Sequence, residues 1–227
     1  MENRRIWEVD FLRVVAIVLM VIFHTVYDLN EFVSINIDYL RGFWYWEGKV
    51  SALLFIFLSG ISSGFSKNTV KRGITVLLFA MIITLFSYIF FREQYIRFGI
   101  LHFLGTGMIL FPLLKKMNNI FLLAIASVIS FAAIPVKSAL ADTSLLLPFG
   151  VMYRGFTTLD YYPLIPYLSV FILGILAYKI YYYKRQSIFK FSYVNEYISM
   201  ISKNSLAIYL IHQPVIIGVI YLFQFSS

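Results

Sequence analysis

The sequence predicts an all-α, polytopic membrane protein, a transmembrane helical bundle of about seven spans. Of its 227 residues, 60% are hydrophobic and only 13% are charged, and the mean hydropathy is +0.81. Soluble domains are about 45–50% apolar and about 25% charged, so a chain of this composition requires lipid around part of its surface. The apolar residues also fall into stretches close to the roughly 20 residues that a bilayer-spanning helix needs. The length predicts one domain over residues 1–227.

The spans follow one another with short connections. Residues 1–13 show no cleavage-site pattern and are expected to lead into a retained first helix. The segment 137–162, with Pro148, Gly150 and Gly155, predicts a long loop, part of it re-entrant in one reading. The segment 192–203 alternates apolar and polar residues and is expected to lie along the inner surface. Gly60 and Gly64 have the spacing of close helix packing. The spans are expected near residues 9–30, 48–66, 73–91, 98–114, 120–136, 163–183 and 204–224.

The basic residues predict the orientation, since they favour cytoplasmic loops. With the N-terminus cytoplasmic and, after seven crossings, the C-terminus extracytoplasmic, the inner side carries thirteen Lys and Arg against four acids. The outer side carries six against seven, and the two sides together account for the net charge of +8. The positive charge therefore meets anionic lipid of the bilayer or an anionic ligand, and no nucleic-acid partner is needed to explain it. The absence of cysteine excludes disulfides and thiolate chemistry.

The first helix carries an unusual set of ionisable residues. Asp10, Arg13, His24 and Asp28 fall on one helical face at about 100° per residue, and ionisable groups at membrane depth are costly unless they have a function. An inner Asp10–Arg13 pair and an outer His24–Asp28 pair are expected. As an alternative, Asp10 and Arg13 only anchor the helix at the interface, with Arg13 reaching toward the headgroups.

All three histidines lie in predicted spans. His24 and His102 belong to the outer side, and His212 lies midway through the last span beside Gln213 and Pro214. Imidazole takes up and returns protons near neutral pH, so histidine is the first candidate for a general base. A histidine metal site is an alternative, but no ligand spacing supports it, and we expect no metal.

Several stretches spread along the chain form a combined pattern. They are Glu8 to Arg13 with His24 and Asp28, Phe55 to Gly60, Arg97 to His102, Asp160 to Pro166, and Ser205 to Pro214. In these stretches the chain resembles the small bacterial DUF1624 proteins, which are related to the catalytic membrane domain of heparan-α-glucosaminide N-acetyltransferase. It is also similar to the wider transmembrane acyltransferase superfamily that includes the acyltransferase-3 proteins.

The resemblance implies a multi-pass enzyme of the bacterial plasma membrane. It implies that cytoplasmic acyl-CoA, usually acetyl-CoA, acylates an acceptor in the cell envelope, such as an extracytoplasmic glycan or small molecule. Acyltransferase-3 proteins carry an Arg and a His separated by ten residues in the first helix, and Arg13 and His24 reproduce that spacing. The lysosomal-type enzymes place a catalytic His in the loop after the first core helix, and residues 31–47 contain none. Their mechanism and glucosamine acceptor are therefore not carried over.

The predicted site combines these residues. His24, oriented by Asp28 or a neighbouring residue, is expected to act as the general base, with His102 as a further catalytic group. Arg13 with Asp10 is expected to bind acetyl-CoA or CoA. Acyl transfer to His24 itself is an alternative. The remaining candidates for acceptor binding are Arg97, Asp160, Tyr209, His212 and Gln213. A solute transporter or receptor, or a non-catalytic scaffold, is the alternative function, and a homodimer is left open.

Overall fold

The computed structural model describes residues 6–33, 35–191, 193 and 195–225. Residues 1–5, which belong to the predicted N-terminal stretch, and positions 192 and 194 of the predicted surface segment lie outside the described residues. The secondary structure is almost wholly helical, so the all-α class is confirmed. The elements are α1 (Trp7–Val33), α2 (Gly42–Ser63), α3 (Thr69–Phe90), α4 (Ile100–Lys116), α5 (Asn119–Ser138), β1 (Leu140–Ala141), η1 (Ser144–Phe149), β2 (Met152–Tyr153), α6 (Leu164–Ala177), the π-helical turn η2 (Tyr178–Tyr182), α7 (Glu196–Lys203) and α8 (Ser205–Phe225).

Each of the seven predicted spans corresponds to a helix, and five of these are long and apolar enough to cross a membrane. These five lie at Trp7–Val33, Thr69–Phe90, Asn119–Ser138, Leu164–Tyr182 and Ser205–Gln224. Large apolar side chains on α5 point outward, with Ile120 83% and Phe131 72% exposed. Such a surface requires lipid rather than water, which supports the membrane assignment. The crossings assigned to residues 48–66 and 98–114 remain predictions, as does the orientation of the termini.

The local sequence accounts for several helix starts. The side chains of Asn68, Asn118 and Asn195 accept hydrogen bonds from the first backbone N–H groups of α3, α5 and α7, as N-cap residues do. The segment predicted as a long loop contains the 3₁₀ turn η1 and the two-residue parallel pair of β1 with β2.

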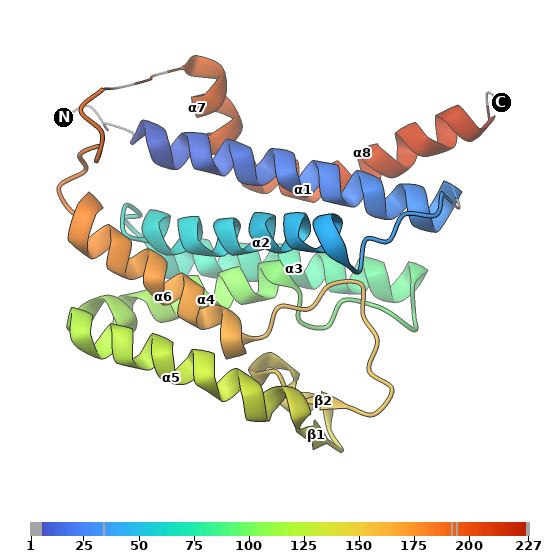
Figure 1. Ribbon diagram of the computed structural model, residues 1–227, viewed down its shortest axis with the longest axis horizontal. Helices are drawn as coiled ribbons and strands as arrows, with labels where there is room; N and C mark the ends of the chain where they lie inside the picture. Colours follow the sequence, from blue (N-terminus) through green and yellow to red (C-terminus); the bar gives the residue numbers. More distant parts are fainter. Residues whose placement is uncertain (1–5, 34, 192, 194, 226–227) are drawn as a thin grey trace. The chain divides into compact units, whose positions relative to one another are not determined.

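The chain divides into two compact units, residues 1–55 with 185–227 and residues 56–184. In the first unit, which we call unit 1, α1 packs along α8 and α7 (Figure 1). The first part of α2 also lies against α1. The hydroxyl of Ser51 donates to the carbonyl of Ala16 at 3.0 Å, and a Cβ on Gly48 would come within 2.6 Å of the Phe23 ring.

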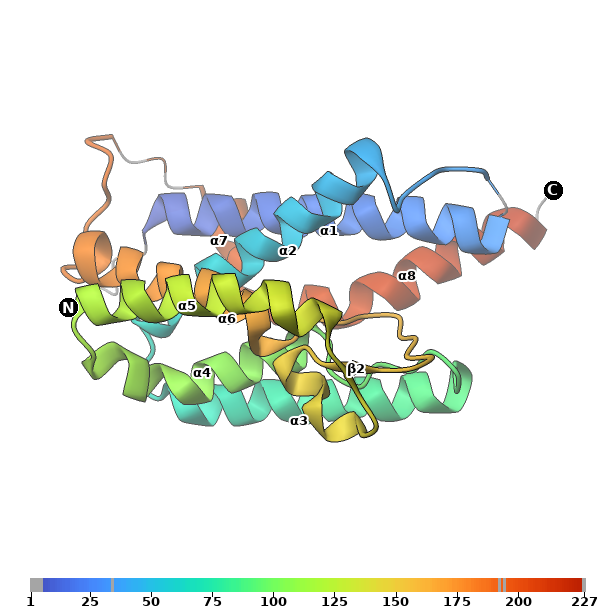
Figure 2. The same cartoon turned by 60° about the horizontal axis from the view of Figure 1, so that its bottom comes forward.

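The second unit, unit 2, contains two helix pairs, α3 with α4 and α5 with α6 (Figure 2). The last part of α2 joins α6 through two glycines. A Cβ on Gly60 would lie 3.0 Å from the Cα of Gly174 and would overlap the carbonyl oxygen of Phe171. The close packing expected at Gly60 is therefore confirmed, and Gly174 is its partner.

Candidate functional site

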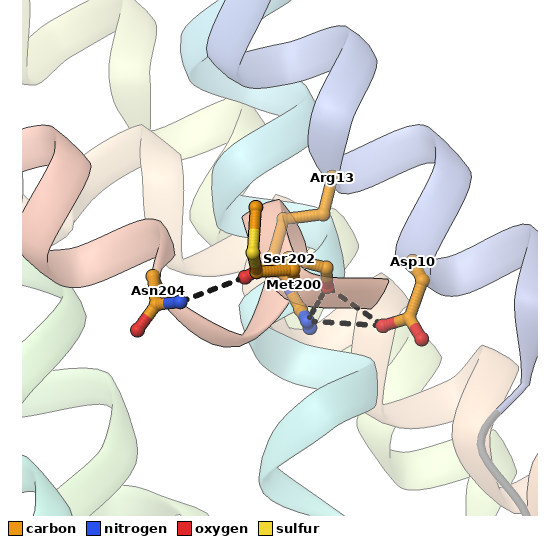
Figure 3. A network of polar contacts seen from close by, with 5 residues as sticks. All are labelled: Asp10, Arg13, Met200, Ser202 and Asn204. Atoms are coloured by element: carbon orange, nitrogen blue, oxygen red, sulfur yellow. Dashed lines mark hydrogen bonds and ion pairs between the residues drawn. The ribbon is translucent and has the colours of Figure 1, made fainter. Parts of the chain in front are cut away.

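The N-terminal end of α1 carries a charged network that is largely buried. One guanidinium nitrogen of Arg13 donates to the hydroxyl of Ser202 at 2.7 Å, and Ser202 donates to a carboxylate oxygen of Asp10 at 2.6 Å. The same nitrogen of Arg13 lies 3.6 Å from that oxygen, and the three side chains converge in Figure 3. Asp10 and Arg13 are paired as expected. Ser202, at the end of α7, is the member that sequence reasoning missed, because nothing local marks a serine 192 positions after Asp10.

The start of α1 also holds the segment that precedes α7. The indole N–H of Trp7 contacts the Ser187 hydroxyl and the Phe191 carbonyl, each at 3.2 Å. A carboxylate oxygen of Glu8 accepts the backbone N–H of Ile188 at 2.8 Å. Because Lys190 belongs to this held segment, the contacts keep a basic residue beside the α1 start.

Two histidines meet in the other half of unit 1. The rings of His24 on α1 and His212 on α8 are 4.7 Å apart and nearly perpendicular. The Nδ1 atom of His24 lies 2.9 Å from the carbonyl of Met20, and that of His212 contacts the carbonyl of Tyr209. Because a carbonyl only accepts, each Nδ1 carries the hydrogen, and each Nε2 is left with the lone pair of a base.

Asp28 lies one turn after His24 and is fully buried. Both of its oxygens accept from the side-chain amide of Gln213, at 2.7 and 3.0 Å. Asp28 or a neighbouring residue was expected to orient His24. The structure shows His24 held by the backbone of Met20 and Asp28 held by Gln213. Two neighbouring residues of α8, His212 and Gln213, thus contact two residues of α1 that lie one turn apart. Tyr209 completes the group, its ring 5.3 Å from that of His212.

Glu47 is a second residue that sequence reasoning missed. It was counted only as an outer-side acid, because it follows Trp44 and Trp46 at the edge of a predicted span. Its side chain is 8% exposed, and neither carboxylate oxygen has a hydrogen-bond partner among the described residues. The polarity of Glu47 at the start of an apolar helix was available from the sequence, but its burial was not.

His102, in unit 2, has the opposite hydrogen arrangement. Its Nδ1 accepts the backbone N–H of Gly99 at 3.2 Å, so the hydrogen sits on Nε2. That Nε2 lies 3.2 Å from the Thr84 hydroxyl, which itself donates to the carbonyl of Ile96 at 2.7 Å. Both ring nitrogens of His102 are therefore used: Nδ1 caps the start of its own helix, α4, and Nε2 joins α4 to α3.

Arg97 and Asp160 hold together two connecting segments of unit 2, residues 91–99 and 150–163. The guanidinium of Arg97 stacks 4.0 Å from the Tyr95 ring and donates to the carbonyl of Thr157 at 2.9 Å. Asp160 accepts the first backbone N–H of α4, that of Ile100, at 2.8 Å, and so acts as its cap. The segments also share the hydrogen bonds Leu159 N–H to Gln94 and Tyr162 N–H to Phe98.

Tyr161 lies in the same pair of segments. Its hydroxyl donates to the carbonyl of Leu147 at 2.8 Å, and burial raises its pKa to about 12. At neutral pH the phenol therefore stays a neutral donor, and it ties the connection before α6 to η1.

The structure distributes the predicted site residues over the two units. Unit 1 holds the network of Asp10, Arg13 and Ser202 and, in its other half, the group of His24, Asp28, Tyr209, His212 and Gln213. Unit 2 holds Arg97, His102 and Asp160. No group of three or more His, Asp or Glu side chains arranged to hold a metal ion occurs within the described part of the chain.

Searches among curated proteins and among solved structures give no significant match. A model of one protein family, described as heparan-alpha-glucosaminide N-acetyltransferase, catalytic, matches residues 5–214. That range contains both polar groups of α1 and their partners on α7 and α8, as well as the two connecting segments of unit 2. Since the match covers most of the chain, this protein belongs to the heparan-alpha-glucosaminide N-acetyltransferase catalytic family.

Proposed function

We propose that the chain is an acyltransferase that uses cytoplasmic acyl-CoA, chiefly acetyl-CoA, to acylate a hydroxyl or amine of an extracytoplasmic acceptor. Membership of the family indicates a membrane acetyltransferase-like role. The observation that carries the proposal is the histidine pair. Backbone carbonyl oxygens accept the Nδ1–H groups of His24 and His212, so each Nε2 keeps the lone pair of a base. General-base catalysis requires such a lone pair within reach of the proton that it removes.

The chemistry assigned to His24 is a proton transfer. Its Nε2 takes the proton of the acceptor hydroxyl or amine as the acceptor oxygen or nitrogen attacks the thioester carbonyl. The carbon–sulfur bond then breaks, and the proton on the imidazolium neutralises the departing CoA thiolate. The bond from Nδ1 to Met20 fixes the ring orientation through both steps. His212, Gln213, Asp28 and Tyr209 are proposed to line the acceptor side.

The network of Asp10, Arg13 and Ser202 is proposed to receive CoA. Asp10 and Ser202 hold the guanidinium of Arg13 in place, so its charge is directed before the ligand arrives. CoA carries several phosphate groups, and arginine contacts phosphate through charge-assisted hydrogen bonds. The sequence places further basic residues, Lys184, Arg185 and Lys190, in the connection before α7.

Arg97, Asp160 and His102 are proposed to act chiefly by holding the connecting segments of unit 2 in place. Their hydrogen bonds to Thr157, Ile100 and Gly99 support this role. Stabilisation of the thioester oxyanion by His102 or Arg97 would require one of these donors to change partner.

The proposal includes a topology and a location. Seven crossings with a cytoplasmic N-terminus and an extracytoplasmic C-terminus in the bacterial plasma membrane would place Arg13 toward acyl-CoA and His24 toward the envelope. The acceptor proposed is a sugar-containing molecule, and a homodimer is compatible with this arrangement.

A thermal-shift titration of the purified protein in detergent tests the donor assignment. Acetyl-CoA and CoA at about 100 times their dissociation constants should stabilise the folded state by about 2.7 kcal/mol, roughly 5–10 °C in Tm for a chain of this size. NADH, an anionic nucleotide control, should not do so. The absence of any shift with folded protein would favour a transporter or a scaffold.

The catalytic assignment is tested with labelled acetyl-CoA in membrane vesicles from cells that produce the chain. His24→Ala and the ring-sized His24→Phe should lose acetyl transfer to products other than CoA and keep the acetyl-CoA thermal shift. Thr25→Val is the matched control, since the Thr25 hydroxyl only bonds its own helix backbone at Val21. Turnover retained in both His24 variants would refute the assignment.

A further inference from the structure

The hydrogen-bonding atoms left over around the histidine pair are all acceptors. Among the described residues of unit 1, both oxygens of Glu47, the Nε2 of His212 and the side-chain oxygen of Gln213 are buried without a partner, as is one oxygen of Glu8 at the start of α1. A buried polar atom without a partner is rare and costly, and a carboxylate is the costliest of these groups. A molecule that binds here must therefore supply hydrogen-bond donors.

The register between α1 and α2 places Glu47 level with His24. Ser51 of α2 contacts Ala16 of α1. Gly48, which comes three residues before Ser51 on α2, lies against Phe23, which comes seven residues after Ala16 on α1. The two helices therefore run antiparallel. Glu47 is one turn before Ser51 on the same face of α2, and one turn beyond Ala16 on α1 is Met20. The carbonyl of Met20 is the group that binds His24 Nδ1.

A structural ion pair does not explain Glu47. The nearest cation in sequence, Lys49, lies two residues along the helix and so on the opposite face, with its ammonium 5.9 Å from the centre of the Tyr45 ring. An apolar residue would be less costly than an unpartnered carboxylate at this depth. A residue retained at such a cost indicates a ligand.

We propose that Glu47 positions the acceptor substrate by accepting hydrogen bonds from a hydroxyl or ammonium group of that substrate next to the group that is acylated, beside the His24–His212 pair. The inference rests on the proposed function and adds to it a substrate-positioning residue. Glu47 holds the neighbouring group, and His24 removes the proton of the hydroxyl or amine that attacks the thioester. The carboxylate remains unchanged through the reaction.

Two measurements on the full chain in lipid nanodiscs test this role, with glycerol and ethanolamine as probe acceptors. The first is labelling by dicyclohexylcarbodiimide, which modifies carboxyl groups in apolar surroundings, followed by mass spectrometry of the peptides. Glu47 should be labelled, and ethanolamine or glycerol at ten times its dissociation constant should slow that labelling about tenfold. Glu31, an exposed carboxylate on α1, should show no such protection.

The second measurement is release of CoA from acetyl-CoA in the presence of the same probes. Loss of a hydrogen bond to a charged group corresponds to a factor of about 10 to 100, so Glu47→Gln should raise the KM for the probe by that factor. Its dissociation constant for acetyl-CoA should stay within about twofold of the parent, since Glu47 contacts the acceptor and not the donor. Glu31→Gln is the matched control and should change neither quantity.

The outcomes separate this inference from the proposed function. If acetyl-CoA does not bind or neither probe is acetylated, the labelling experiment decides alone. Protection of Glu47 by a probe then supports a site for hydroxyl or ammonium groups, and its absence overturns the inference. If transfer occurs and Glu47→Gln keeps the parental KM and kcat, Glu47 does not position the acceptor.

Discussion

The contact between Gly60 and Gly174 gives the most direct test of the packing in unit 2. In Gly174→Ala, the added Cβ would overlap the carbonyl oxygen of Phe57 and lie 3.0 Å from the Cα of Gly60. Both neighbours are backbone atoms of α2, so no side-chain rotation relieves the overlap. The helices must move apart, and the contacts along the whole crossing are weakened.

The magnitude follows from the cost of overpacking, about 1–3 kcal/mol for an inserted methyl group. Because the neighbours are backbone atoms, the cost should lie at the upper end of this range. We expect the free energy of unfolding to fall by about 3 kcal/mol, or roughly 6–12 °C in Tm for a chain of this size. Alanine is also a better helix former than glycine by about 1 kcal/mol, which offsets part of the loss.

Gly218 on α8 is the matched control, because a Cβ there would meet nothing within 4 Å. Gly218→Ala should leave Tm unchanged or raise it slightly through helix propensity alone. Thermal unfolding of the parent and both variants in the same detergent, followed by far-UV circular dichroism, gives the comparison. A Gly174→Ala protein that melts with or above Gly218→Ala would refute the close approach of α2 and α6.

Three further variants test individual contacts. Asp160→Ala should lower the free energy of unfolding by about 0.5–2 kcal/mol, because the Ile100 N–H loses its cap. Asp160→Asn should keep most of the parental stability, and equal Tm values for the two variants would contradict the capping role. Ser202→Ala should cost about 1–3 kcal/mol by leaving the Asp10 carboxylate short of a donor and should weaken acetyl-CoA binding measured by calorimetry, whereas Ser202→Thr should restore both. His102→Ala should lower the free energy of unfolding by about 2–4 kcal/mol and keep transfer per folded molecule. Lost transfer at an unchanged Tm would instead support His102 as an oxyanion donor.

Helical periodicity was enough to predict the polar face of α1. It placed Asp10, Arg13, His24 and Asp28 together, and the structure gives Asp10 and Arg13 a shared network. The partners could not be predicted, because Ser202 and Gln213 lie 189 and 185 positions away along the chain from Arg13 and Asp28. Such pairs depend on how α7 and α8 fold back onto α1, which local patterns do not encode.

The histidines show a second limit. The sequence presents His24, His102 and His212 as equivalent residues in apolar spans. Which ring nitrogen carries the hydrogen depends on whether Nδ1 meets a backbone carbonyl or a backbone N–H group. The sequence does not show which backbone group each ring will meet. The burial of Glu47 could not be predicted for a related reason, since it depends on residues distant in sequence.

The continuity of α1 has a mechanical consequence. Its 27 residues from Trp7 to Val33 contain neither proline nor glycine, so the helix has no built-in hinge. Arg13 and His24 are about 16 Å apart along this rod. A rotation or axial shift of the end that carries Arg13, such as a bound anion pulling on Arg13 would produce, must therefore appear at His24 with little attenuation. The position of the His24 ring would then be coupled mechanically to binding at Arg13.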